Sequence, residues 1–277
     1  MSSFVTDPYR LQMRVSRRIR QLVRRFSAER SLIIVGSAHK VGSTWLCHLI
    51  SDLCDCPGYT IDSKVRRMNQ EKLPVDIDLD TIVAGAEVPR GTFILKSHSI
   101  PPINPLPPWV KLITMTRDPR DVIVSSAFYL ANIPVESGGW GDTFAALSEK
   151  ERIADIIKNG EFLRSRLRAW NTVREAHHAR YETFLEEPNA ELKRLQTFLN
   201  NRKSAEQVAK IIDQRSFASE SGRARGTADN AAFLRKGVYG DWRNYFDDEL
   251  KDLYKSACNG DWKDLLTELG YQSDNDW

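Results

Sequence analysis

Small, charged and hydroxyl-bearing residues gather in the segment Gly36-Ser-Ala-His-Lys-Val-Gly-Ser-Thr-Trp45, directly after a short apolar run. Small residues allow backbone N–H groups to converge on an anion, and the N-terminus of a following helix adds a positive dipole end. Lys40 supplies a mobile cation, and Ser43 and Thr44 supply hydroxyl donors. The segment therefore predicts a binding site for a phosphate or a similar anion.

The order of residues in this segment differs from the nucleotide-triphosphate loop G-x-x-x-x-G-K-[ST]. In that loop the lysine follows the last glycine, whereas Lys40 precedes Gly42 by two residues and Ser43 stands in the lysine's place. The usual arrangement for holding Mg²⁺ is not reproduced, which disfavours an ordinary kinase or ATPase. A P-loop kinase or nucleotide hydrolase stays open as the alternative, because an apolar run also precedes Asp118.

Further residues of catalytic type follow other apolar runs. Lys96 and His98 lie two positions apart, so an extended backbone directs both side chains to the same side. Arg117 follows the run 111–115, and Arg235, Lys236 and Gly237 lie together much later in the chain. Taken singly, each has an ordinary structural explanation, such as a packed core histidine or a pair between Arg117 and Asp118. Only their combination points to a site.

The elements that would position these residues alternate between strand and helix. Short apolar runs predict strands over 31–36, 93–95 and 111–115, with Tyr181 at a last strand. Helical patterns cover 43–52, 119–130 (with Asp118 as N-cap and Pro119 in the first turn), 148–179, 189–199 and 204–212. This alternation predicts an α/β fold with a doubly wound parallel sheet flanked by helices. We expect a single domain over 31–277, preceded by a basic amphipathic helix within 1–30.

The motifs together resemble the cytosolic-type sulfotransferases that use 3′-phosphoadenosine 5′-phosphosulfate (PAPS). Lys40-Val-Gly-Ser-Thr-Trp45 is similar to their phosphosulfate loop, and Leu95-Lys-Ser-His98 to the segment with their catalytic histidine. Thr116–Ser125 resembles their 3′-phosphate segment, with arginine and serine eight positions apart. Arg235-Lys-Gly-Val-Tyr-Gly-Asp-Trp242 is similar to their C-terminal motif. The resemblance covers 32–246 and is specific as a combination.

The resemblance implies a role for each matched residue. His98 would be the general base, Lys40 would neutralise charge on the leaving phosphate, and Lys96 would stabilise the sulfuryl oxygens. The residues implied to bind the cofactor, or its product 3′-phosphoadenosine 5′-phosphate (PAP), are Lys40, Gly42, Ser43, Thr44, Trp45, Arg117, Ser125, Tyr181, Phe217, Arg235, Lys236 and Gly237. Ser125 would also restrain Lys40. No metal is implied, and the Gly-, Ser- and Arg-rich segment 215–239 would form a lid.

Two segments depart from the family's pattern. Arg215-Ser-Phe217 stands where the family often has Thr-Ser-Phe, which leaves a side-chain contact of residue 215 with the nucleobase unsupported. The stretch 243–249 lacks the dimer motif of many animal members. The oligomeric state is therefore not predicted.

Composition limits the remaining functions. Forty Lys and Arg against thirty-seven Asp and Glu give a net charge of only +3, so we expect no nucleic-acid partner. Four cysteines form neither a disulfide framework nor a zinc motif, and no apolar stretch reaches the length of a membrane span or forms a secretory signal. We therefore expect reduced thiols and a cytoplasmic location.

The arginine-rich N-terminal segment leaves a second alternative open. Its apolar residues recur every three or four positions through 9–30, as on one face of a helix. We favour docking of this face on the domain. Weak contact with an anionic membrane surface, or a non-catalytic binding protein built around this helix, are the alternatives. The expected acceptor is a small molecule carrying a hydroxyl or an amine, bound by loops over 58–87, 133–143 and 217–233.

Overall fold

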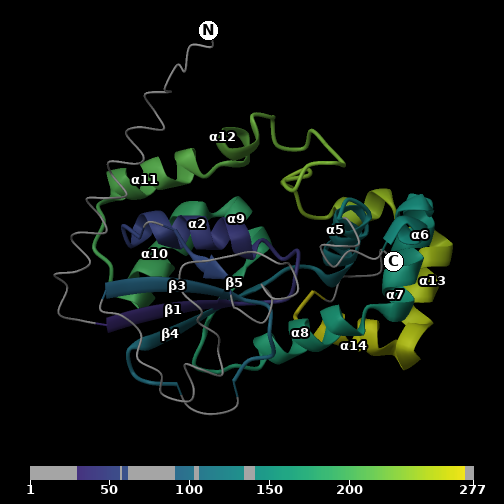
Figure 1. Cartoon of the computed structure of the whole chain (residues 1–277), viewed down its shortest axis with the longest axis horizontal. Helices are drawn as coiled ribbons and strands as arrows, with labels where there is room; N and C mark the ends of the chain where they lie inside the picture. The colour runs from purple at the N-terminus through teal and green to yellow at the C-terminus, as the bar shows by residue number, and fades with distance from the viewer. Residues whose placement is uncertain (1–29, 57, 62–90, 103–105, 134–140, 272–277) are drawn as a thin grey trace, which may run out of the picture.

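A five-stranded sheet forms the centre of the molecule (Figure 1). The computed structural model describes residues 30–56, 58–61, 91–102, 106–133 and 141–271. All strand pairs are parallel, in the order β2-β3-β1-β4-β5. The strands are β1 (Arg30–Gly36), β2 (Thr60–Ile61), β3 (Gly91–Ser97), β4 (Val110–Thr116) and β5 (His177–Arg180). From β1 the chain passes to the edge strand β2 and returns to β3 beside β1, and it then crosses to β4 and β5 on the other side of β1, which confirms the predicted doubly wound α/β fold.

The central strand β1 is apolar on both faces because helices or loops cover both sides of the sheet. Ile33 and Val35 face the larger core cluster, whereas Leu32 and Ile34 face a second cluster around Trp170. Trp170 lies against Gly36, where an added Cβ would meet its ring at 2.1 Å. The tight contact fixes the end of β1, from which the predicted anion loop departs.

Helices pack on the two sides of the sheet. Figure 1 shows α2 (Ser43–Leu53), α9 (Tyr181–Glu186), α10 (Pro188–Leu199) and α11 (Ala205–Gln214) above it, followed by the short α12 (Phe217–Ser221). On the other side, α8 (Glu161–Asn171) contacts β4 and α14. A helical group beside the sheet comprises α5 (Pro119–Ala131), α6 (Gly141–Ala146), α7 (Glu149–Asn159), α13 (Asp248–Ser256) and α14 (Asp261–Glu268). Two 3-10 helices, η2 (Asp241–Asn244) and η3 (Ala257–Gly260), complete the C-terminal part.

Most predicted elements are confirmed, but two predictions around β5 are wrong. Tyr181 begins helix α9 and does not belong to a strand, and the predicted helical pattern 148–179 is interrupted after Asn171 and ends in β5. The last strand was expected at Tyr181, one residue beyond β5, because β5 is a short edge strand in which His177 and His178 replace the apolar run that would mark its bounds. The predicted cap of α5 is confirmed, since the Asp118 carboxylate accepts the N–H of Arg120.

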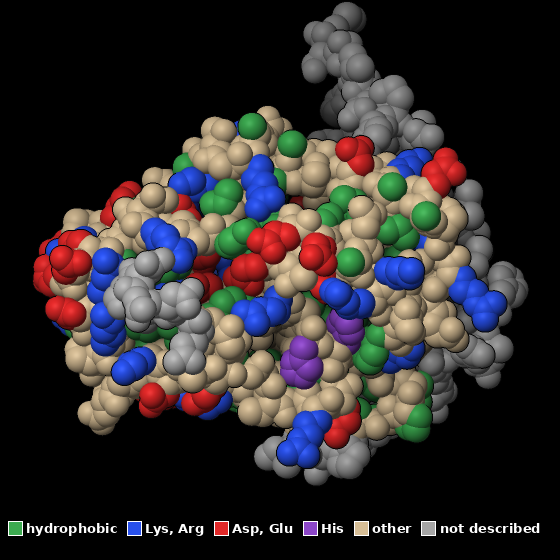
Figure 2. Space-filling view, turned by 180° about the vertical axis from the view of Figure 1, so that it is seen from behind, with side chains coloured by type: hydrophobic (Ala, Val, Ile, Leu, Met, Phe, Trp, Pro, Cys, Tyr) green, Lys and Arg blue, Asp and Glu red, His purple; other side chains and the backbone are tan. Residues whose placement is uncertain are grey.

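The surface shows no single-sign concentration of charge on the face seen in Figure 2, where basic and acidic side chains are interspersed. The four cysteines, all described, are free thiols. Within the described ranges, no helix has the length and apolarity needed to cross a membrane. The predicted N-terminal helix and most of the predicted acceptor loops 58–87 and 133–143 lie outside the described residues, so those expectations stay predictions.

Candidate functional site

A pocket opens where the chain leaves the carboxyl ends of the strands, the usual place for ligands in a doubly wound sheet. Every residue for which the sequence predicted a catalytic or cofactor-binding role lines this one pocket: Lys40, Gly42, Ser43, Thr44, Trp45, Lys96, His98, Arg117, Ser125, Tyr181, Phe217, Arg235, Lys236 and Gly237. These residues come from segments as far apart as the end of β1 and the chain after α12, and the fold brings them together.

The loop after β1 is shaped by Gly42. This residue has φ +98°, and a Cβ there would lie 2.6 Å from the Tyr181 ring, so both backbone and space require glycine. Gly42 is the N-cap of α2, and no side chain caps the helix. Unpaired N–H groups at such an end attract anions, and the dipole of the helix adds to the effect. The loop can therefore hold a phosphate at the start of α2.

Lys40 extends from this loop into an aromatic cage formed by Tyr129 and Phe233. Its Nζ lies 3.9 Å from the ring centre of Tyr129 and 4.4 Å from that of Phe233. Burial, and then the charges of Arg117, Lys96 and Arg235, lower the pKa of Lys40 from 10.5 to about 7. The hydrogen bond between Ser125 and Lys40 that the family resemblance implies is not found among the described residues; the ammonium lies between the two rings instead.

His98 is held in one tautomer by the backbone. Its Nδ1 lies 2.9 Å from the carbonyl oxygen of Ser37, which can only accept a hydrogen bond. Nδ1 therefore carries the proton and Nε2 offers a lone pair. Burial is the main reason why the pKa of His98 lies well below 6.5, so the ring is neutral at pH 7 and can act as a base.

Lys96 reaches the same pocket two residues before His98, as the extended backbone predicted. Its Nζ donates to the hydroxyl oxygen of Thr44 at 2.8 Å. Thr44 belongs to the first turn of α2, so this bond ties β3 to the anion loop. The contact keeps the ammonium of Lys96 between the loop and the histidine, where it can meet an anionic group.

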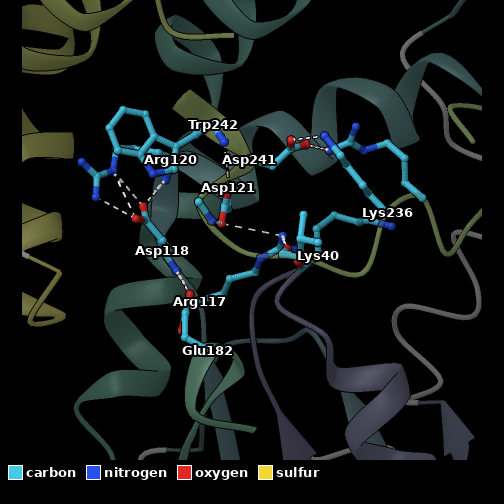
Figure 3. Close-up of polar contacts among 12 residues, drawn as sticks. Lys40, Arg117, Asp118, Arg120, Asp121, Glu182, Lys236, Asp241 and Trp242 are labelled. Carbon is cyan, nitrogen blue, oxygen red and sulfur yellow. Dashed lines mark hydrogen bonds and ion pairs between the residues drawn. The ribbon is translucent and has the colours of Figure 1, made fainter. Parts of the chain in front are cut away.

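The ordinary structural explanation for Arg117, an ion pair with Asp118, does not hold. Asp118 binds the guanidinium of Arg120 at 3.0 Å and 2.7 Å, so Arg117 is left for the pocket (Figure 3). Arg117 donates to the backbone oxygens of Lys40 and Val238, at 3.2 Å and 2.9 Å. Its guanidinium carbon lies 4.4 Å from the ring centre of Tyr181. Its buried Nε has no hydrogen-bond partner among the described residues, so this N–H can donate to a ligand.

The C-terminal motif is anchored by two aspartates. Asp241 binds both Arg235 and Lys236, the latter at 2.6 Å (Figure 3). Asp121 of α5 accepts the backbone N–H groups of Gly240 and Trp242, at 2.6 Å and 2.9 Å. Asp121 thus ties the motif to the helix that also carries Ser125 and Tyr129.

Gly237 completes the motif through a close approach of the backbone to an aromatic ring. Its φ is +67°, and a Cβ at this position would meet the Phe217 ring at 2.3 Å. Phe217, Trp45 and Tyr181 form the aromatic part of the pocket, in which the rings of Trp45 and Tyr181 lie edge to face at 6.1 Å. Such faces suit the stacking of a nucleobase.

Arg215, where the sequence departs from the family's pattern, forms ion pairs that join neighbouring segments of the protein. Its guanidinium binds Asp52 at 2.6 Å and 3.1 Å and reaches Glu220 at 3.3 Å. Its carbonyl oxygen accepts the indole N–H of Trp45 at 2.6 Å. The side chain of residue 215 is thus committed to carboxylates, and its backbone positions Trp45.

Hydrogen bonds within the segment after α12, most of them to its own carbonyl oxygens, hold its shape. Arg223 donates to the carbonyl oxygens of Thr227, Leu234 and Arg235. Backbone bonds also join Gly226 to Lys236 and Asp229 to Arg235. The predicted lid is therefore a folded loop that carries Phe233 and the C-terminal motif to the pocket.

Several pocket residues had no individual role in the sequence analysis, among them His39, Tyr129 and Phe233, although Phe233 lies in the predicted acceptor loop 217–233. Tyr129 lies four positions after Ser125 on α5, and this spacing could have placed it on the same helical face. Phe233 directly precedes the Arg235 motif. His39, which the sequence analysis gave no role, stacks on His98 with ring centres 4.0 Å apart.

The charge of the pocket fits a polyanion. Six cationic side chains and one carboxylate, that of Glu220, line it: Lys40, Lys96, Arg117, Arg215, Arg235 and Lys236. The anion loop and the Arg235 motif both contribute to this lining from segments far apart in the sequence, which suits a ligand with two phosphates. No group of three or more His, Cys, Asp or Glu residues that could hold a metal ion is found in the described part of the chain.

Comparison with known proteins identifies the family. The sequence model of the sulfotransferase domain matches residues 30–266. The chain belongs to the sulfotransferase family. Mouse sulfotransferase 1B1 is 24% identical over 265 residues, which cover 86% of each chain. Human sulfotransferase 6B1 is 25% identical over 290 residues, covering 96% of this sulfotransferase and 88% of the human protein.

Solved structures share the fold of this sulfotransferase. Mouse sulfotransferase SULT7A1 complexed with PAP has a TM-score of 0.59 at 21% identity, covering 92% of this chain and 90% of that one. Retinol dehydratase in complex with retinol and PAP has a TM-score of 0.60 at 18% identity, covering 91% and 86%. Family membership makes the protein a transferase of sulfuryl groups, and the kinase or nucleotide hydrolase alternative is set aside.

Proposed function

We propose that this sulfotransferase transfers the sulfuryl group of PAPS to a hydroxyl or an amine of a small-molecule acceptor, with His98 as general base. The observation that carries the proposal is the gathering of cationic side chains and aromatic rings from distant segments in one pocket. The relatives of known structure hold PAP, and retinol dehydratase also holds retinol or androsterone, which supports a small acceptor. PAPS supplies an activated sulfuryl group and leaves as PAP.

The anion loop would bind the 5′-phosphate end. Gly42, Ser43 and Thr44 offer backbone and hydroxyl donors at the uncapped start of α2. Lys40, next to them, would neutralise the negative charge that develops on the leaving oxygen. Its pKa of about 7 lets it hold or release its proton near neutral pH. An approaching phosphate favours the charged form, so binding itself would keep Lys40 protonated.

A second group of pocket residues would bind the 3′-phosphate: Arg117, Ser125, Arg235, Lys236 and the N–H of Gly237. The buried Nε of Arg117, which lacks a partner among the described residues, fits an acceptor oxygen supplied by such a ligand. Because Asp241 already binds Arg235 and Lys236, these cations are preoriented and need little ordering to meet the phosphate.

The acceptor would approach from the side of His98. Nε2 of this ring takes the proton of the acceptor, because Nδ1 is already committed to Ser37. Lys96, between Thr44 and the histidine, would stabilise the sulfuryl oxygens during transfer. The segment 215–239 would close over the nucleotide and shape the acceptor pocket, since it carries both Phe217 and Phe233 to the pocket walls.

Titration calorimetry with PAP and with adenosine 5′-phosphate tests whether separate groups of residues bind the 5′- and 3′-phosphates. Charge-assisted hydrogen bonds contribute about 1.5–3 kcal/mol each, so two of them to the 3′-phosphate predict at least about 100-fold tighter binding of PAP. Arg235→Ala should remove most of this preference and leave the affinity for adenosine 5′-phosphate nearly unchanged. Arg243→Ala is the matched control, because Arg243 is exposed and does not line the pocket. Equal affinity of the unaltered protein for both nucleotides would overturn the assignment.

A further inference from the structure

Glu220 is the one carboxylate among the described residues that line the pocket, and the proposed roles leave it unused. Its side chain is 13% exposed. A negative charge at this place repels the phosphates of a nucleotide, so it weakens binding unless another group of the ligand is bound by it. The position and the hydrogen bonds of Glu220 indicate which group that is.

Glu220 lies beside the aromatic rings of the pocket. It follows Phe217 by three positions on α12, and His48 follows Trp45 by three positions on α2. Residues three apart are neighbours on one side of a helix. Nδ1 of His48 lies 2.9 Å from Oε1 of Glu220. The indole N–H of Trp45 donates at 2.6 Å to the carbonyl oxygen of Arg215, two residues before α12 begins. These contacts join the two helices and place the carboxylate next to the rings of Trp45 and Phe217.

The two carboxylate oxygens of Glu220 differ in their partners. Oε1 lies 2.9 Å from Nδ1 of His48 and accepts from the guanidinium of Arg215 at 3.3 Å. Oε2 makes no hydrogen bond to any residue in the described ranges. Burial raises the pKa of Glu220, but the hydrogen bonds from His48 and Arg215 lower it more, so that it lies below its usual value. The carboxylate is therefore ionised at neutral pH, and Oε2 is an oriented acceptor beside the rings.

Adenine offers such an oxygen one kind of hydrogen-bond donor. Its 6-amino group carries N–H bonds, whereas its unsubstituted ring nitrogens are acceptors. An ionised carboxylate can only accept. A carboxylate beside a stacked adenine is therefore attracted by the 6-amino group and repelled by the ring nitrogens, which makes the amino group the part of the base that Glu220 can recognise.

We propose that Oε2 of Glu220 accepts a hydrogen bond from the 6-amino group of adenine, which makes Glu220 a residue that determines nucleobase specificity. The inference rests on the proposed function, in which the pocket binds PAPS and PAP. A purely structural role accounts for Oε1 but gives Oε2 no use. Arg215 does not depend on Glu220 for its charge, because Asp52 binds the same guanidinium at 2.6 Å and 3.1 Å.

Titration calorimetry can compare PAP with the 3′,5′-bisphosphate of purine riboside, which is PAP without the 6-amino group. A hydrogen bond to a charged acceptor predicts about 10- to 100-fold tighter binding of PAP by the unaltered protein. In Glu220→Ala this preference should fall to about twofold or less, and in Glu220→Gln the neutral amide oxygen should leave about 2- to 10-fold. The affinity for the purine riboside compound should not fall in either variant, because the phosphate-binding residues keep their partners and a repelling charge is removed.

Glu206→Gln is the matched control, because Glu206 is exposed on α11 and does not line the pocket. It should keep the full preference for PAP. If Glu220→Ala does not fold, Glu220→Gln decides alone, since it keeps the size of the side chain. Equal weakening of both nucleotides in the Glu220 variants would make the residue purely structural, and equal binding of both by the unaltered protein would also overturn its role. Equal affinity for PAP and adenosine 5′-phosphate would instead refute the proposed function, because those two differ only in the 3′-phosphate.

Discussion

The lowered pKa of Lys40 predicts that PAP binding depends on pH in a specific way. Lys40 lies between Tyr129 and Phe233 with a pKa of about 7, against an ordinary value of 10.5. A bound phosphate favours the charged form and raises this pKa again. If the ordinary value is restored in the complex, the change in pKa corresponds to about 5 kcal/mol of coupling between proton and ligand. Proton and phosphate therefore bind cooperatively.

The expected magnitude follows from the fraction of charged Lys40. At pH 8 about one molecule in eleven carries the proton before binding, so about 0.9 proton is taken up with each PAP. The Kd for PAP should therefore rise about fivefold from pH 7 to 8 and about ninefold from pH 8 to 9. Phosphate groups are already doubly charged in this range, and the two pocket histidines have pKa values below it. The dependence can therefore be attributed to Lys40.

Titration calorimetry in buffers of different ionisation enthalpy measures both the Kd and the proton uptake. Lys40→Arg keeps a permanent charge and should bind PAP with a nearly flat dependence on pH from 7 to 9. Lys40→Met should bind weakly at all pH values, also without proton uptake. A Kd for the unaltered protein that changes less than twofold between pH 7 and 9, with no proton taken up, would refute the reasoning.

Three further predictions concern other parts of the site. His98→Ala should lower turnover about 10²- to 10⁴-fold while PAP affinity stays nearly constant; parallel loss of both in kinetics and calorimetry would make the histidine structural. Asp121→Asn should cost about 2–3 kcal/mol in urea unfolding, because a buried acceptor of two backbone N–H groups is weakened, whereas the exposed Asp248→Asn should cost less than about 0.5 kcal/mol. Hydrogen exchange should show PAP protecting 215–239 and 40–45 together; protection of 40–45 alone would separate the C-terminal motif from the cofactor site.

Much of the site could be predicted because its residues lie in short segments with a local signature. Gly42 is needed for a left-handed backbone next to Tyr181, and the Lys96 and His98 pair follows a strand, so residue type and local spacing carry the information. The carboxyl ends of parallel strands then bring such segments to one edge of the sheet. The fold class follows from these two rules, whereas the full set of pocket residues was implied by the resemblance to the sulfotransferases.

The partners of those residues could not be predicted, because they depend on side-chain packing between distant segments. Nothing in the local sequence shows that Asp118 binds Arg120 while Arg117 turns to the pocket, or that the ring of His39 stacks on His98. The surroundings of Lys40 could not be predicted either, because its aromatic cage combines Tyr129 of α5 with Phe233 from the loop beyond α12. The last strand was expected one residue beyond β5 for another reason: the polar edge residues of β5 lack the hydrophobic pattern on which strand prediction depends.

The anchoring of the C-terminal motif by Asp121 also has a consequence for folding. The N–H groups that Asp121 accepts belong to residues 119 and 121 positions later in the chain, so these contacts are strongly non-local. Contacts of such separation form slowly, because a long loop must close before they contribute any stability. During synthesis, the sheet and α5 are complete long before the Arg235 motif leaves the ribosome. The newly made chain would thus acquire its anion loop early and its ability to distinguish PAP from simpler nucleotides late.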